Sequence, residues 1–162
     1  MQSKILSTNP VKNLTNTLLS LFALCTLAAC ASSRPANKSA LEIPVFDKDQ
    51  VWQLTDMRGK PVDTQGKTFT LQLYPDAGIV RGYMACNMYF GHYTCHPGDP
   101  QTGRYPIEIV LEGSGSLGCP EADMNADSRY YALLLKATHF SYTSTTLTLY
   151  QNDKEILRYE LQ

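Results

Sequence analysis

The centre of the chain reads Phe69-Thr70-Leu71-Gln72-Leu73-Tyr74-Pro75-Asp76-Ala77-Gly78, an alternation of apolar and polar residues that ends in a tight turn. Apolar side chains at every second position predict a strand with one buried face. Pro75 fixes its own φ and Gly78 tolerates a positive φ, so the chain can reverse here. The sequence therefore predicts an antiparallel hairpin in which residues 79–86 form the partner strand.

The same period of two recurs on both sides of this hairpin. Further strands are predicted at 51–55, 105–111, 146–150 and 155–161, with a turn at 58–61 and a hairpin loop at 151–154. In the strand at 105–111, Glu108 faces outward with the neighbouring Glu112, as expected of a solvated face. Trp52 is expected to fill the core. The chain after the N-terminal region thus contains about seven or eight strands.

One helix interrupts the strands. Pro120 suits a first helical position, and the acidic side chains of Glu121 and Asp123 suit the positive end of the helix dipole. A start at Asp127, capped by its own side chain, is the alternative. The face predicted to be buried consists of Met124, Ser128, Tyr131, Leu134 or Leu135, and Thr138. The predicted fold class is α+β: a mostly antiparallel curled sheet or small barrel with one helix packed on it.

The N-terminal region has the features of an export signal. Lys4 and Lys12 precede an apolar run, Leu18 to Ala29, that is too short to span a bilayer, which takes about 20 residues. The run ends in Leu27-Ala28-Ala29-Cys30, which resembles the lipobox of bacterial lipoproteins. We therefore expect residues 1–29 to be a signal peptide and Cys30 to be lipidated. An ordinary secretory signal that happens to end in cysteine is the alternative.

Residues 30–48 are expected to be the lipidated cysteine and a flexible tether, because they are rich in Ser, Ala, Pro and Lys and show little periodicity. Ala31 follows the cysteine in place of an aspartate, which favours the outer membrane as the destination in a Gram-negative cell. After residue 29 the chain has 12 basic and 15 acidic residues, a formal charge of −3. This charge, with no basic stripe, excludes the ordinary nucleic-acid-binding classes.

Several segments of residues 49–162 resemble the META/HslJ-type domain. These are Val51-Trp52-Gln53-Leu54, the run from Gly82 to Tyr93 that contains Cys86-Asn87-Met88-Tyr89-Phe90-Gly91, Cys119 followed by a helix, and Leu147-Thr148-Leu149. The chain departs from the family pattern at Ala85, where a glycine is usual, and in the 112–118 segment, which lacks the customary threonine. The family includes envelope lipoproteins connected with envelope stress and antibiotic tolerance, and it has no established catalytic activity.

Three cysteines remain after Cys25 and Cys30: Cys86, Cys95 and Cys119. The resemblance implies a disulfide between Cys86 and Cys119. A two-residue turn at Phe90-Gly91 would instead place Cys86 opposite Cys95 on paired strands, so this second pairing stays open.

The residue types that carry chemistry are few. His92, Cys95 and His96 lie within five positions, but adjacent Cys95 and His96 point to opposite faces of a strand. We therefore expect no metal, no cofactor and no catalytic residues, and a structural role for His139. Of the tyrosines at 83, 89, 93 and 105, most should pack at the edge of the core, and a subset is expected to form a binding surface.

The sequence as a whole predicts a non-enzymatic outer-membrane lipoprotein of the META/HslJ type, a binding or envelope stress-tolerance module. Its expected partners are the membrane, through Cys30, and an envelope protein or small molecule of unknown identity. The alternative is a periplasmic inhibitor-type binding protein similar to the lysozyme inhibitors, suggested by Gly113-Ser114-Gly115-Ser116.

Overall fold

The central hairpin forms as its sequence predicts. The computed structural model describes residues 39–62 and 66–162, and in it β3 (Thr70–Tyr74) pairs antiparallel with β4 (Ile79–Tyr83). Phe69, Leu71 and Leu73 are buried, and Gly78 closes the turn with a φ of 62°. The return strand ends at Tyr83 and not at Cys86 as expected, because the residues from Met84 to Asn87 turn toward the helix.

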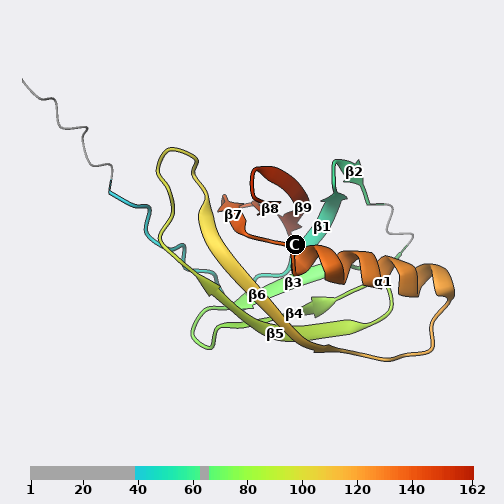
Figure 1. The fold of residues 1–162 in the computed structure, drawn as a ribbon. Helices are drawn as coiled ribbons and strands as arrows, with labels where there is room; N and C mark the ends of the chain where they lie inside the picture. Colours follow the sequence, from blue (N-terminus) through green and yellow to red (C-terminus); the bar gives the residue numbers. More distant parts are fainter. Residues whose placement is uncertain (1–38, 63–65) are drawn as a thin grey trace, which may run out of the picture. The chain divides into compact units, whose positions relative to one another are not determined.

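The strands close into a barrel (Figure 1). The remaining strands are β1 (Trp52–Met57), β2 (Lys60–Pro61), β5 (Met88–Cys95), β6 (Tyr105–Ser114), β7 (His139–Tyr142), β8 (Thr146–Gln151) and β9 (Lys154–Leu161). The order is β2-β1-β3-β4-β5-β6-β7-β8-β9, every pairing is antiparallel, and β1 also pairs with β9. The closed ring therefore has eight strands, since β2 is a two-residue extension folded back on β1. The expected small antiparallel barrel is confirmed.

One helix, α1 (Glu121–Leu134), packs on the barrel, and Pro120 is its N-cap. Glu121 and Asp123 lie in its first turn, as the dipole argument predicts. The alternative start at Asp127 is wrong, because that residue lies inside the helix. No helix in the described part of the chain is long and apolar enough to cross a membrane.

The predicted buried face of α1 is wrong. Met124 is 49% exposed and Ser128 is exposed. Leu134 is buried as predicted, but the other buried residues of the helix are Asp123, Asp127, Tyr130 and Leu133. A search for apolar residues at helical spacing misses this face because two of its residues are aspartates. Their burial is tolerated because both side chains have hydrogen-bonding partners in the structure.

Large aromatic and aliphatic side chains fill the interior of the barrel. Trp52, Tyr89, Tyr130, Phe140 and Tyr159 are all fully buried. Phe46, within the segment expected to be a tether, is also buried, and its ring lies 5.7 Å from that of Phe140. Trp52 thus takes the core position expected for it.

Three buried tyrosine hydroxyls meet inside this core. Tyr89 donates to the carbonyl oxygen of Thr70 at 2.9 Å, and its oxygen lies 3.2 Å from that of Tyr130. The Tyr130 and Tyr159 oxygens are 3.0 Å apart. Burial, followed by the neighbouring tyrosines, raises the pKa of each of the three phenols well above its ordinary value. The cluster joins β5, α1 and β9 through polar contacts at the centre of an otherwise apolar core.

These tyrosines predict a loss of stability at alkaline pH. The unfolded chain releases their protons near a pKa of about 10, while the folded chain retains them. The free energy of unfolding should therefore fall above about pH 10, by about 1.4 kcal/mol per pH unit for each tyrosine, until the raised folded pKa values are reached. Urea unfolding between pH 8 and about 11.5 measures the slope. Tyr130→Phe should reduce this slope by the contribution of one tyrosine, whereas Tyr83→Phe, at an exposed position, should leave the slope unchanged. Equal slopes in wild type and both variants would contradict the raised pKa values.

Candidate functional site

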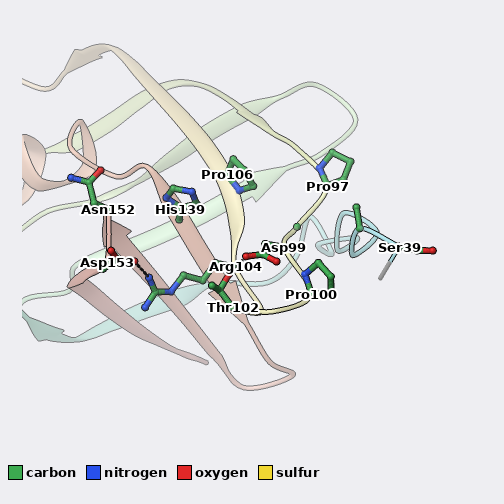
Figure 2. Close-up of a pocket in the computed structure, with 12 residues that line it drawn as sticks. Ser39, Pro97, Asp99, Pro100, Thr102, Arg104, Pro106, His139, Asn152 and Asp153 are labelled. Atoms are coloured by element: carbon green, nitrogen blue, oxygen red, sulfur yellow. Dashed lines mark hydrogen bonds and ion pairs between the residues drawn. The ribbon is translucent and has the colours of Figure 1, made fainter. Parts of the chain in front are cut away.

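A pocket of about 740 Å³ lies where residues 39–41 join the barrel (Figure 2). Leu41 pairs there with Gly98 through two backbone hydrogen bonds of 2.8 Å. Arg104 pairs with Asp153 at 3.0 Å and stacks over the Tyr150 ring at 4.1 Å. Asp99 accepts hydrogen bonds from the backbone N–H of Gln101 and the hydroxyl of Thr102. Arg104, Asp153 and Asp99 in this pocket are therefore each engaged with neighbouring groups of the protein.

His139 lines the same pocket and has the structural role expected of it. Its Nδ1 lies 3.0 Å from the Thr138 hydroxyl, which in turn accepts the backbone N–H of Asn152 at 2.7 Å. This contact fixes the hairpin between β8 and β9.

His92, Cys95 and His96 lie close together in the sequence, but they are not grouped as metal ligands in the described part of the chain. His92 points outward from β5 and lies 3.3 Å from Glu112, which is exposed like Glu108 on the same strand. His96 follows the end of the strand. In residues 39–62 and 66–162, no three His, Cys, Asp or Glu side chains are grouped so that they could hold a metal ion. Partial burial raises the pKa of the Cys95 thiol, which keeps this free cysteine protonated near neutral pH.

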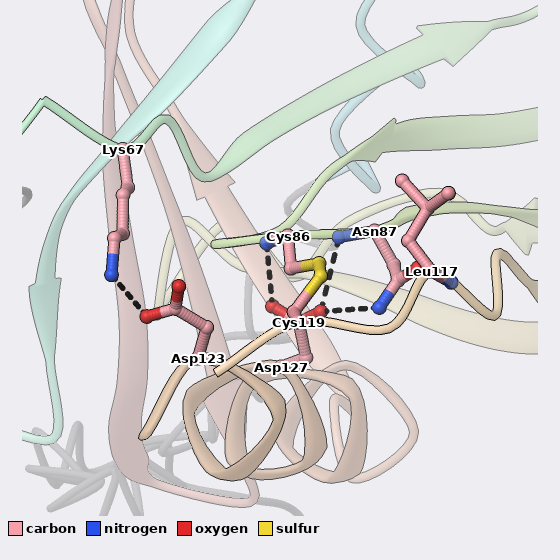
Figure 3. The surroundings of a disulfide bond; sticks show 7 residues. All are labelled: Lys67, Cys86, Asn87, Leu117, Cys119, Asp123 and Asp127. Carbon is pink, nitrogen blue, oxygen red and sulfur yellow. Dashed lines mark hydrogen bonds and ion pairs between the residues drawn. A yellow bond between two sulfur atoms is a disulfide. The ribbon is translucent and has the colours of Figure 1, made fainter. Parts of the chain in front are cut away.

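The turn that follows β4 is the point where strand, loop and helix are joined (Figure 3). Cys86 forms a disulfide with Cys119, with Cα atoms 6.4 Å apart, and this is the pairing that the family resemblance implies. The alternative turn at Phe90-Gly91 is wrong, because β5 runs through both residues with only a bulge between them. Cys86 and Cys95 therefore lie at opposite ends of β5.

Asp127 ties the helix to the same turn. Its carboxylate, on a residue only 5% exposed, accepts the backbone N–H of Cys86 at 3.2 Å, the backbone N–H of Asn87 at 3.1 Å and the Asn87 side-chain amide at 3.0 Å. The side-chain oxygen Oδ1 of Asn87 accepts the backbone N–H of Leu117 at 2.9 Å. Asn87 is thus a bridge from the helix to the loop that leads into it. Nearby, Lys67 forms an ion pair with Asp123 one turn earlier in the helix.

Sequence reasoning named Cys86 and Cys119 but missed Asn87, Asp127 and Leu117 as partners. The signal that could have found Asp127 is its spacing: Asp123, Asp127, Tyr130 and Leu134 lie on one helical face. The interpretation failed because only apolar residues were counted toward the buried face.

The remaining residues of the Cys-Asn-x-Tyr-x-Gly run also have identifiable roles. Tyr89 carries one of the hydroxyls of the buried tyrosine cluster. Gly91 lies so close to β6 that an added Cβ would be 2.1 Å from the Val110 carbonyl oxygen. Within six residues, the run therefore contains the disulfide cysteine Cys86, the hydrogen-bonding amide of Asn87, the buried hydroxyl of Tyr89 and the close approach to β6 at Gly91.

Gly91→Ala should destabilise the domain because the clash is with backbone. We expect a loss of about 1–3 kcal/mol in the free energy of unfolding, measured by urea denaturation. Gly118→Ala is the matched control, since its Cβ would meet nothing within 4 Å, and it should change stability by less than about 0.5 kcal/mol. Equal stability of the two variants would contradict the close approach of β5 and β6.

A cleft of about 550 Å³ opens beside the disulfide, between α1 and the loop at 114–118. Its lining consists of Met84, Asn87, Ser114, Gly115, Ser116, Leu117, Gly118, Met124, Asp127, Ser128 and Tyr131. Leu117 and Met124 are 66% and 49% exposed, so the cleft has an apolar rim. Asn87 and Asp127 are its buried polar groups. The Ser-Gly segment that suggested an inhibitor loop lies here, with Gly113 against the Phe90 ring and Gly115 against Asn87.

The tyrosines divide as the sequence predicts. Tyr89 and Tyr93 are buried, and Tyr105 stacks on Phe140 with ring centroids 5.0 Å apart. Tyr83 is exposed on the outer face of the barrel, beside its cross-strand partner Met88.

A small closed antiparallel barrel, covered by one helix and locked by a disulfide beside a surface cleft, defines the class of protein. The sequence matches the META domain over residues 46–162, and the chain therefore belongs to the META domain family. No significant match was found among curated protein sequences.

The chain is similar to solved structures. A protein from Burkholderia xenovorans, determined by NMR, is 18% identical with a TM-score of 0.53, and the match covers 75% of this chain and 94% of that one. A DUF4847 family protein from Bacteroides vulgatus, determined by crystallography, is 12% identical with a TM-score of 0.48, covering 70% of this chain and 92% of that one. At 18% identity, the similarity to the Burkholderia xenovorans protein concerns the fold and not the function.

The disulfide predicts a specific pattern of stability changes. Cys86→Ser and Cys119→Ser should each lower the free energy of unfolding by about 3–4 kcal/mol, as expected for a bridge with a sequence separation of 33 residues. The double variant should cost little more, because either change removes the same bond. Cys95→Ser should be neutral within about 0.5 kcal/mol. Peptide mapping without reduction checks the pairing, and a fragment joining Cys86 to Cys95 would contradict it.

Proposed function

We propose that the protein is a non-enzymatic binding module of the cell envelope, anchored in the outer membrane by lipid on Cys30 and acting in envelope maintenance or stress tolerance. The observation that carries the binding role is the cleft at 114–118. The interior of the barrel is occupied by side chains, so a ligand would be held at the surface, and this cleft is held by a disulfide and by the hydrogen bonds of Asp127. A rigid, largely apolar hollow with few polar groups is typical of a binding site.

The lining of the cleft supports binding over catalysis. Its titratable side chains are Asp127 and Tyr131. Asp127 is engaged with the backbone of the turn, and the lining contains no His or Lys that could act as a base for its serines.

The anchor and the location rest on the sequence. Leu27-Ala28-Ala29-Cys30 lies outside the described residues and supports the proposal through its resemblance to a lipobox. A disulfide in the domain agrees with an oxidising compartment outside the cytoplasm. Two or three acyl chains on one residue would hold the protein firmly, because each buried CH₂ contributes about 0.8 kcal/mol.

Cys30→Ala tests the anchor. Wild-type protein should incorporate labelled palmitate and partition into the detergent phase, whereas Cys30→Ala should incorporate no label and remain unprocessed or enter the aqueous phase. Cys25→Ala, in the same N-terminal region, is the control and should behave as wild type. Unlabelled wild-type protein, or membrane fractionation that is identical with and without Cys30, would disprove the lipid anchor.

A further inference from the structure

The geometry of the cleft beside α1 points to a ligand class: we propose that it binds a small organic cation, an amine or amidinium joined to an apolar body. This inference deepens the proposed binding function and rests on it, but it does not depend on lipidation of Cys30. The site consists of the Asp127 carboxylate and the apolar side chains of Met84, Leu117, Met124 and Tyr131.

The carboxylate of Asp127 gives the cleft a negative charge. All three hydrogen bonds to its carboxylate come from neutral N–H donors, and the ion pairs found among the described residues do not include it. The lining of the cleft contains no Lys, Arg or His. Lys67, which contacts the first turn of the helix, is paired with Asp123. The cleft therefore holds a buried negative charge that no side chain of the described domain neutralises.

The Asp127 carboxylate also retains an unused hydrogen-bond acceptor site. A carboxylate offers about four lone-pair sites, and three are used here, two on Oδ2 and one on Oδ1. The remaining site, on Oδ1, has no hydrogen-bonding partner among the described residues, and Asp127 is part of the cleft lining. A charged donor forms a stronger hydrogen bond than a neutral one, so an ammonium or amidinium group suits this position better than a hydroxyl or amide.

The surface around the Asp127 carboxylate is largely apolar. Leu117 and Met124 expose 66% and 49% of their surface at the rim, and the thioethers of Met84 and Met124 pack well against aromatic rings. Covering this rim with an apolar body removes apolar surface from water. The volume of about 550 Å³ suits a ligand of small-molecule size. An anion would be repelled by Asp127, and a neutral apolar ligand would leave its charge without a partner.

Methionine methyl NMR tests the proposal on the intact protein, whether or not Cys30 is acylated. Met84 and Met124 line the cleft, whereas Met57 and Met88 lie elsewhere on the barrel, so the protein carries its own internal controls. The probe is 2-phenylethylamine, with 2-phenylethanol as the neutral analogue and 3-phenylpropionate as the anion. The amine should shift the Met84 and Met124 signals in a saturable way and leave Met57 and Met88 unmoved. It should bind at least about fivefold more tightly than the alcohol, and the anion should not bind.

A pair of variants tests the role of charge without disturbing Asp127 itself. Ser128→Lys places a cation at the cleft and should weaken binding of the amine at least about fivefold. Asn125→Lys adds the same charge at an exposed helix position outside the lining and should leave binding within about twofold of wild type. Unchanged Met57 and Met88 signals report that both variants are folded.

Three results would overturn the proposal: no shift of Met84 and Met124 with the amine, equal affinity for amine and alcohol, or equal binding by Ser128→Lys and wild type. Each leaves the acylation test of Cys30 unaffected, so failure of the ligand class is distinguishable from failure of the anchor.

Discussion

Asp127 carries a carboxylate from the second turn of α1 into the turn after β4, where it is almost completely removed from water. Burying a charge costs several kcal/mol unless hydrogen bonds replace the lost water, and here three N–H groups from Cys86 and Asn87 do so. The position of the helix and the shape of the turn therefore depend on each other. A shift of α1 along its axis would leave the carboxylate buried without donors, so the hydrogen bonds fix the helix at one place on the barrel.

The disulfide and the tyrosine cluster act on the same helix at other points. The Cys86–Cys119 bond limits how far the loop before α1 can move, whereas Tyr130 inserts a hydroxyl between Tyr89 and Tyr159 further along the helix. Apolar burial supplies most of the stabilisation of the core, but it is non-directional and leaves the rotation of a helix weakly defined. The directional contacts of Asp127 and Tyr130 define that rotation, and they also explain why Met124 is left facing the cleft.

The sequence predicted the parts of this structure that follow from local alternation. The hairpin at 69–83, the strands near the C-terminus and the position of Trp52 depend on neighbouring residues and on the period of a strand. The buried face of α1 could not be predicted in the same way, because Asp127 and Tyr130 are buried only by virtue of partners about 40 positions away. The disulfide pairing came from resemblance, since the spacing of three cysteines is compatible with more than one hairpin geometry. The cleft combines residues of the 114–118 loop with the helix face that was misjudged, so the sequence could name the loop but not the site.

The closure of the barrel between β1 and β9 determines when the domain can fold. The first strand lies beside the last, with Trp52 opposite Leu161 and the side chains of Gln53 and Gln162 hydrogen-bonded across 109 positions. Such distant pairing carries a large loop-closure entropy and slows folding. A chain that emerges from a ribosome or a translocation pore starting at its N-terminus can build the 69–83 hairpin and its pairing with β1 early, but the other edge of β1 stays unpaired until β9 has emerged. The folding of this domain is therefore a late, collective event, and the exposed edge of β1 is most open to wrong pairing, or to chaperone capture, just before the last strand arrives.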